Sequence, residues 1–88
     1  MANIASQRKR IARSERERLE NRRLRSAVKT YFHRLESAVE GGEESTIATA
    51  HRELVSRIDK AVQKGALHAN NGARKKTRAA RITRRRPA

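Results

Sequence analysis

The hydrophobic positions follow a helical period through most of the chain. Between Leu24 and Val39, apolar residues recur three and four positions apart, which places them on one face of a helix. That face consists of Leu24, Ala27, Val28, Tyr31, Phe32, Leu35, Ala38 and Val39. Upstream of Leu24 the same face is polar or charged. The pattern therefore predicts one long helix that joins a protein core only through its second half.

This first helix is expected over residues 6–40. Either Asn3 or Ser6 is placed to cap it, because their side chains can accept hydrogen bonds from the free amides of a first helical turn. No proline or glycine interrupts the helix before Gly41-Gly42, which favours a left-handed cap and a turn. The helix is longer than a chain of this size needs for packing.

A second helix is expected over residues 45–64, with Ser45 or Thr46 as its cap and Gly65 after its last turn. Its apolar face consists of Ile47, Ala50, His51, Leu54, Val55, Ile58, Ala61 and Val62. Only a short turn separates it from the first helix. The two helices are therefore predicted to form an antiparallel hairpin.

A third helix is expected over residues 68–85, ahead of Pro87, and its apolar pattern is weak. The least polar side carries small residues, Ala69, Ala73, Thr77 and Ala80, which would let the helix lie close to the hairpin. Together the elements predict an all-α fold, an up-down-up three-helix bundle within one domain of residues 1–88. The long first helix is expected to extend beyond the bundle.

The amino-acid composition indicates that the protein binds a polyanion. The 88 residues include 23 Lys and Arg against 9 Asp and Glu, a net charge of +14. The charge is uneven, since residues 1–34 and 66–88 are strongly basic and the middle of the chain is slightly acidic. There is no cysteine and no long apolar run, which predicts a cytoplasmic protein without a disulfide framework, a signal peptide or a membrane span.

Two sets of basic residues have the spacing of a helix flank. The first-helix set is Arg18, Arg22, Arg25 and Lys29, and the third-helix set is Arg74, Arg78, Arg81 and Arg85. A guanidinium binds two phosphate oxygens at once, and displaced counterions supply much of the affinity for a nucleic acid backbone. A solvated charged face is the alternative, but such a face usually mixes its signs. Here basic residues repeat at i, i+4 with few acidic neighbours.

Other chemistry is poorly supported. Glu15, Glu17 and Glu20 are interpreted as helix-supporting partners of nearby arginines, since no pocket is expected there that would suit acid–base catalysis. The three histidines are far apart, so no metal site is predicted. Tyr31 and Phe32 are expected in the core and not as a base-stacking surface. No cofactor or small-molecule substrate is expected, because phosphate-binding loops and nucleophile motifs are absent.

Three stretches of the sequence resemble the bacterial small-subunit ribosomal protein S20 family. They are residues 2–10, residues 21–30 and residues 59–70, and the last ends in Lys64-Gly65-Ala66-Leu67-His68-Ala69-Asn70 ahead of a basic segment at residues 73–78. The resemblance covers nearly the whole chain. It implies a non-enzymatic three-helix protein that binds small-subunit ribosomal RNA in the cytoplasm, supports subunit assembly, and is present as a monomer within the particle.

The charge pattern and the resemblance together give a set of candidate RNA-binding residues. They are Ser6, Arg8, Lys9, Arg10, Arg13, Arg18, Arg22, Arg23, Arg25, Lys29, Lys64, His68, Asn70, Arg74, Lys75, Lys76, Thr77, Arg78, Arg81 and Arg85. For His68, capping of the third helix is an alternative to RNA contact. Gly72 and Ala79 stand where the family often has larger residues, which predicts a loosely packed third helix.

Two other functions fit parts of the pattern. A basic nucleoid-type or coiled-coil DNA-binding protein also places arginines ahead of an apolar seam, but residues 24–39 cover only about two heptads. A membrane-active cationic protein would need its apolar and basic residues to overlap along the helix. The arginine-rich residues 8–23 and the tail at residues 84–88 are expected to fray in the free protein, because like charges crowd there without a core.

Overall fold

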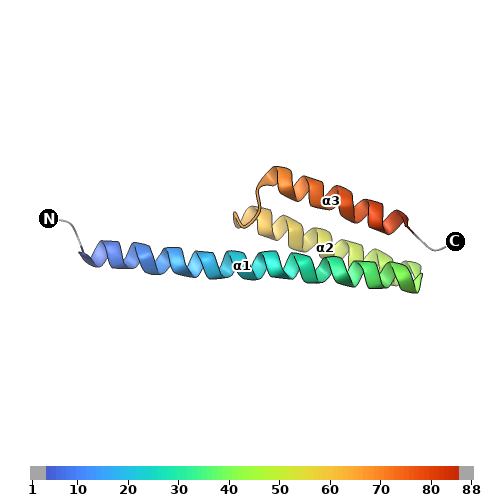
Figure 1. Cartoon of the computed structure of the whole chain (residues 1–88), viewed down its shortest axis with the longest axis horizontal. Helices are drawn as coiled ribbons and strands as arrows, with labels where there is room; N and C mark the ends of the chain where they lie inside the picture. The colour runs from blue at the N-terminus through green and yellow to red at the C-terminus, as the bar shows by residue number, and fades with distance from the viewer. Residues whose placement is uncertain (1–3, 86–88) are drawn as a thin grey trace.

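Three helices make up the protein in the computed structural model, which describes residues 4–85. They are α1 (Ile4–Gly41), α2 (Glu44–Gln63) and α3 (Ala69–Arg84). In Figure 1, α2 runs back along the second half of α1, and α3 then returns beside them in the direction of α1. The first half of α1 projects beyond both, so the molecule measures 69 × 20 × 13 Å. The expected all-α three-helix arrangement with a long first helix is confirmed.

Glycines end the first two helices. Gly42 has a φ of 75°, and its N–H donates to the carbonyls of Ala38 and Val39, each at 3.1 Å. Gly65 has a φ of 79° after the last turn of α2, where the N–H of Ala66 donates to the carbonyl of Ala61 at 2.8 Å. Both positions need the left-handed backbone that glycine adopts without a steric penalty. These two glycine caps were predicted correctly.

Ser6 is not the N-cap of α1, and the N-cap of α2 is neither Ser45 nor Thr46. Ser6 lies inside α1, which is already helical at Ile4, and Asn3 lies outside the described residues. The cap of α2 is Glu43, which makes no side-chain capping hydrogen bond. The Ser45 hydroxyl instead donates to the Glu43 carboxylate at 3.1 Å. After the short turn, α2 begins at Glu44, which precedes both predicted caps.

The core lies between the second half of α1 and the inner faces of α2 and α3. Its buried residues are Val28, Phe32, Leu35, Val39, Ile47, Ala50, Leu54, Ile58, Ala61, Ala66, Ala79 and Ile82. Leu24 is the first residue of α1 to pack against this cluster, whereas every residue from Ile4 to Glu20 is exposed. The change of character at Leu24 is therefore the point where the arm, residues 4–23, gives way to the bundle.

The buried face of α3 is not the predicted one. Ala69, Ala73 and Thr77 are exposed and Ala80 is half-buried, and the helix buries Gly72, Ala79 and Ile82 instead. Ile82 is the one large aliphatic side chain of α3. A rotation of α3 that buries Ile82 stabilises the bundle more than a rotation that buries several alanines and leaves Ile82 exposed to water. The prediction was wrong because it counted small residues and gave too little weight to this single isoleucine.

Packing between α3 and α2 is close at Gly72. A Cβ atom at this position would lie 2.5 Å from Cγ2 of Val62, which is far inside van der Waals contact. The absence of a side chain therefore allows the start of α3 to approach α2. At this point the expectation of a loosely packed third helix is wrong, and Ala79 on the same face is also fully buried.

Candidate nucleic-acid interface

The α1 ridge consists of Arg18, Arg22, Arg25 and Lys29, and all four side chains are exposed. They repeat every three or four residues along a helix that has no break between Ile4 and Gly41. The ridge therefore runs from the arm into the bundle along one side of α1. Only its last two members have a second helix beside them.

The α3 ridge consists of Arg74, Arg78, Arg81 and Arg85, which are exposed as well. Because α3 runs in the same direction as α1 (Figure 1), the residue numbers of both ridges increase toward the same end of the bundle. They meet at a groove between the helices, lined by Arg25 and Lys29 from α1 and by Lys75 and Arg78 from α3. We call this the α1–α3 groove.

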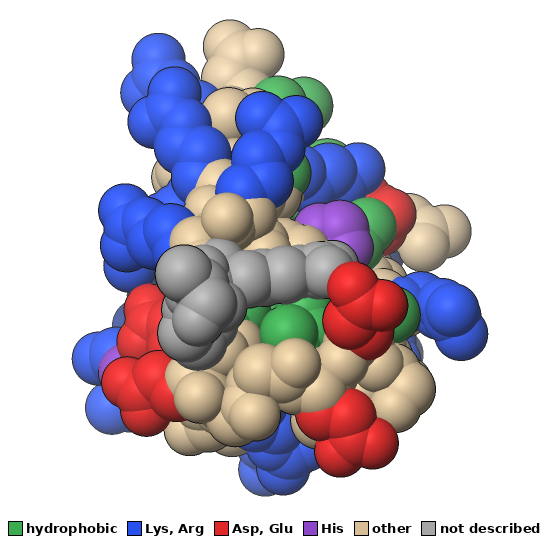
Figure 2. Space-filling model, turned by 90° about the vertical axis from the view of Figure 1, so that its right-hand side faces the viewer, with side chains coloured by type: hydrophobic (Ala, Val, Ile, Leu, Met, Phe, Trp, Pro, Cys, Tyr) green, Lys and Arg blue, Asp and Glu red, His purple; other side chains and the backbone are tan. Residues whose placement is uncertain are grey.

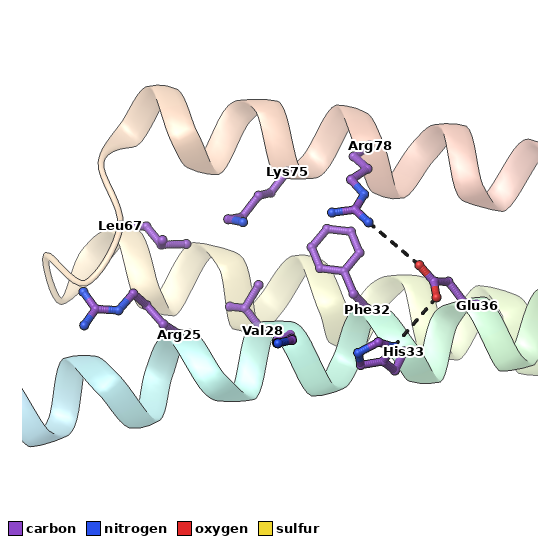
Figure 3. Close-up of a pocket in the computed structure, with 9 residues that line it drawn as sticks. Arg25, Val28, Phe32, His33, Glu36, Leu67, Lys75 and Arg78 are labelled. Atoms are coloured by element: carbon purple, nitrogen blue, oxygen red, sulfur yellow. Dashed lines mark ion pairs between the residues drawn. The ribbon is translucent and has the colours of Figure 1, made fainter.

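The α1–α3 groove has a cationic rim above an apolar floor. In Figure 3 the ring of Phe32 and the aliphatic side chains of Val28 and Leu67 lie between the basic groups of the two helices. The guanidinium carbon of Arg78 lies 4.9 Å from the centre of the Phe32 ring, and Nζ of Lys75 lies 6.0 Å from it. Both distances are within the range of cation–π attraction.

One acidic residue enters this groove. Oε1 of Glu36 lies 3.9 Å from an Arg78 guanidinium nitrogen, and its Oε2 lies 3.8 Å from Nδ1 of His33 (Figure 3). On the opposite side, the Arg25 guanidinium donates to the carbonyl of Ala66 at 3.5 Å. These contacts hold the two arginines at the rim while leaving most of the basic groups free of carboxylates.

The other basic residues of α3 have different positions. Lys76 forms an ion pair with Asp59 of α2, so its side chain lies toward α2 and away from the α1–α3 groove. The Thr77 hydroxyl donates to the carbonyl of Ala73 at 3.1 Å, which is a local helix contact. Both residues are exposed, and both were predicted for RNA contact from the resemblance. The structure does not bring them together with Lys75 and Arg78.

His68 is the N-cap of α3. Its Nδ1 accepts a hydrogen bond from the backbone N–H of Asn70 at 3.1 Å, which satisfies one of the free amides of the first turn. The capping alternative for this histidine is therefore observed. Lys64 and Asn70 are exposed on either side of the α2–α3 connection, at the same end of the bundle as the arm (Figure 1).

The remaining predicted residues lie on the arm. They are Ser6, Arg8, Lys9, Arg10, Arg13 and Arg23, and each is exposed. Arg13 forms the expected i, i+4 ion pair with Glu17 at 3.3 Å, with both side chains more than half exposed. Such a pair contributes only a few tenths of a kcal/mol, about 0.3–0.5 kcal/mol on a helix surface. It supports the arm locally and leaves the arm's positive charge in excess.

Figure 2 shows how charge is distributed at the end of the bundle. Lys and Arg side chains crowd the upper part of this view, on the side of α3, whereas Asp and Glu gather lower down. At this end of the bundle, Glu40, Glu43 and Glu44 lie in or directly beside the α1–α2 turn. Basic side chains are therefore concentrated on the α3 side of this end of the bundle, and others lie lower down and at its flanks.

Phe32 and Glu36 are functional candidates that the sequence reasoning missed. Phe32 was expected in the core, and it is 6% exposed. Its position beneath Lys75 and Arg78 depends on how α3 is rotated, which no spacing within α1 reveals. Tyr31 also pairs with cations, since Arg34 and Arg57 lie 4.7 and 5.0 Å from its ring centre.

The described residues hold no cluster of three or more His, Cys, Asp or Glu side chains that is arranged to bind a metal ion. Within residues 4–85, no helix is both long enough and apolar enough to cross a membrane. The apolar seam of α1 is covered by α2 and α3 of the same chain.

Comparison with known proteins shows which family this chain is similar to. The family model described as ribosomal protein S20 matches residues 2–84. The small ribosomal subunit protein bS20 of Kocuria rhizophila is 44% identical over 77 residues, which are 88% of this chain and 90% of the relative. The bS20c protein of Guillardia theta is 47% identical over 83 residues, covering 89% and 87%. The bS20 protein of Acaryochloris marina is 44% identical over 89 residues, covering 93% and 95%.

Proposed function

Because the chain belongs to the ribosomal protein S20 family, we propose that it binds small-subunit ribosomal RNA directly and stabilises the folding of that RNA during subunit assembly. The family is one of structural components of the small ribosomal subunit, and it is not a family of enzymes. The protein acts within the ribosome in the cytoplasm.

The observation that carries the proposal is the pair of basic ridges bordering one groove. Arg25 and Lys29 end the α1 ridge opposite Arg78 of the α3 ridge, on a chain with a net charge of +14. Folded RNA presents phosphates on neighbouring helical segments, and two ridges held at a fixed separation suit two such segments. The bundle fixes the separation, and the arm extends the α1 ridge along one of the segments.

Salt dependence tests this proposal. The full chain is titrated against a small-subunit ribosomal RNA transcript by filter binding, with large-subunit ribosomal RNA as the control. Affinity is expected to fall about a thousandfold or more between roughly 50 and 200 mM salt, as it does for proteins with about 6–10 phosphate contacts. Nearly constant affinity across this salt range would contradict the proposal that the two ridges bind RNA phosphates. Equal affinity for the control RNA would contradict the assignment to the small subunit.

The protein is proposed to act as a monomer, since α2 and α3 cover the apolar seam of α1 within one chain. Sedimentation of the free protein should therefore give the mass of a single 10.0 kDa chain. An obligate dimer in the absence of RNA would contradict this proposal. It would favour the coiled-coil DNA-binding alternative instead.

A further inference from the structure

The apolar floor of the α1–α3 groove distinguishes it from the rest of the basic surface. On the arm, Arg18 and Arg22 are exposed, and neither lines the groove. In the groove, Phe32 and Leu67 lie between the cations of two helices, in a hollow of about 360 Å³ (Figure 3). Phosphates alone would need only the cations. Because Val28 and Phe32 are buried, a ligand would meet the cations packed on this floor, and a cation held flat against it suits a ligand that has a flat part as well as phosphates.

Arg78 presents a flat surface in this groove. Its guanidinium lies over the Phe32 ring on one side, and Glu36 lies 3.9 Å from one of its nitrogens. Its side chain is nevertheless 63% exposed, so much of it remains accessible to a ligand. Phe32 is 6% exposed and is too deeply buried to meet a ligand itself. The ring therefore supports the guanidinium, and the guanidinium is the available surface.

Guanidinium planes are one of the surfaces on which proteins stack the unpaired bases of RNA. A nucleotide that stacked its base on Arg78 would bring its phosphates near the other cations of the rim. Lys75 lies one turn of α3 before Arg78, and Arg25 and Lys29 lie across the groove on α1. The groove thus combines a stacking surface with phosphate-binding groups, which a continuous duplex would not use together.

We propose that the α1–α3 groove binds an unpaired, extruded nucleotide of RNA, with its base stacked on the Arg78 guanidinium and its phosphates held by Arg25, Lys29 and Lys75. This inference rests on the proposed RNA-binding function and assigns a ligand class to one part of that interface. The α1 ridge on the arm, in contrast, binds the backbone of paired RNA.

The test uses three RNA hairpins of one sequence. The first is fully paired, the second has a single bulged adenosine in its stem, and the third has an abasic nucleotide at the bulge. The full chain is expected to bind the adenosine bulge about tenfold more tightly than the other two, because stacking of one base accounts for a difference of that order. The abasic hairpin separates the effect of the base from that of a flexible backbone.

Arg78→Lys is the informative variant, since it keeps the positive charge and removes the flat guanidinium. The affinities of this variant for the three hairpins should lie within about twofold of one another, because the bulged base can no longer stack on a guanidinium. Arg52→Lys is the matched control, because Arg52 is exposed on α2 and belongs neither to the ridges nor to the groove, and it should keep the tenfold preference. Helix content by circular dichroism shows that both variants are folded.

A tenfold preference that survives in Arg78→Lys would overturn the proposal, as would equal binding of the three hairpins by the unchanged protein. If small-subunit ribosomal RNA is still bound with steep salt dependence, the proposed function stands and only the nucleotide site is lost. If that RNA is not bound either, the proposed function fails as well. Tight binding of free adenosine monophosphate, without the hairpin preference, would also contradict a site for RNA.

Discussion

The arm and the bundle share one helix and one basic ridge, yet they are stabilised very differently. No residue of the arm is buried, whereas the second half of α1 buries Val28, Phe32, Leu35 and Val39 against the other helices. The exposed large hydrophobic residues among those described are Ile4, Ile11 and Leu19, and all three belong to the arm. The arm can therefore contribute to binding without contributing to the stability of the bundle.

This difference explains why the α1 ridge crosses Leu24 without interruption. In the bundle, α1 is held by burial of its apolar face, and the ridge occupies the neighbouring flank. In the arm, the helix depends on propensity and on local pairs such as Arg13 with Glu17, which are weak. A polyanion that neutralised the ridge would supply the stabilisation that the arm lacks.

The largest effect is expected when the same substitution is made in both regions. Leu35→Ala, at a side chain that is 0% exposed, should lower the free energy of unfolding by about 2–5 kcal/mol. Leu19→Ala, at a side chain that is 54% exposed, should change it by less than about 0.5 kcal/mol. Urea unfolding followed by circular dichroism compares the two. Similar losses in both variants would show that the arm packs against the bundle in solution.

A second comparison reverses the roles of the two regions. The double variant Arg18→Ala with Arg22→Ala should weaken RNA binding and reduce the slope of log affinity against log salt by roughly 0.7–0.9 per lost phosphate contact. The free energy of unfolding should stay within about 0.5 kcal/mol, since both side chains are exposed. The charge-matched control is Arg52→Ala with Lys60→Ala on the outer side of α2. An equal loss of slope in this control would show that net charge, and not the ridge, determines binding.

The smallest effect is expected within the bundle, at Gly72. Gly72→Ala would place a Cβ 2.5 Å from Cγ2 of Val62 and should destabilise the protein by about 1 kcal/mol, because overpacking outweighs the better helix propensity of alanine. In a Val62→Ala background the clashing methyl group is absent, so Gly72→Ala should become neutral or stabilising. The same ΔΔG of unfolding in both backgrounds would exclude the close contact as the cause.

The sequence predicted the elements whose burial depends on large apolar residues at regular intervals. The inner faces of α1 and α2 were correct because Leu35, Leu54 and Ile58 leave little choice of face. The face of α3 was not predicted, since Ile82 is its one large apolar residue and alanines occur on several sides. The N-cap of α2 was missed because several neighbouring side chains were chemically suitable.

The candidate interface was predictable along each helix and not between helices. The spacing of Arg18, Arg22, Arg25 and Lys29 gave an exposed flank, which the structure has. The contact of Arg78 with Phe32 and Glu36 joins residues more than forty positions apart, and it depends on the rotation of α3. For the same reason, Lys76 was grouped with Lys75 although it pairs with Asp59 on the other side.

The most direct measurement of the difference between arm and bundle is amide hydrogen exchange with and without small-subunit ribosomal RNA. In the free protein, amides of residues 8–23 should exchange rapidly because no packing opposes fraying, whereas amides between Leu24 and Val39 should be protected. Addition of the RNA should protect the arm amides as well. Protection of the arm without RNA, or continued rapid exchange in the complex, would contradict the account of the arm as a binding element stabilised by RNA.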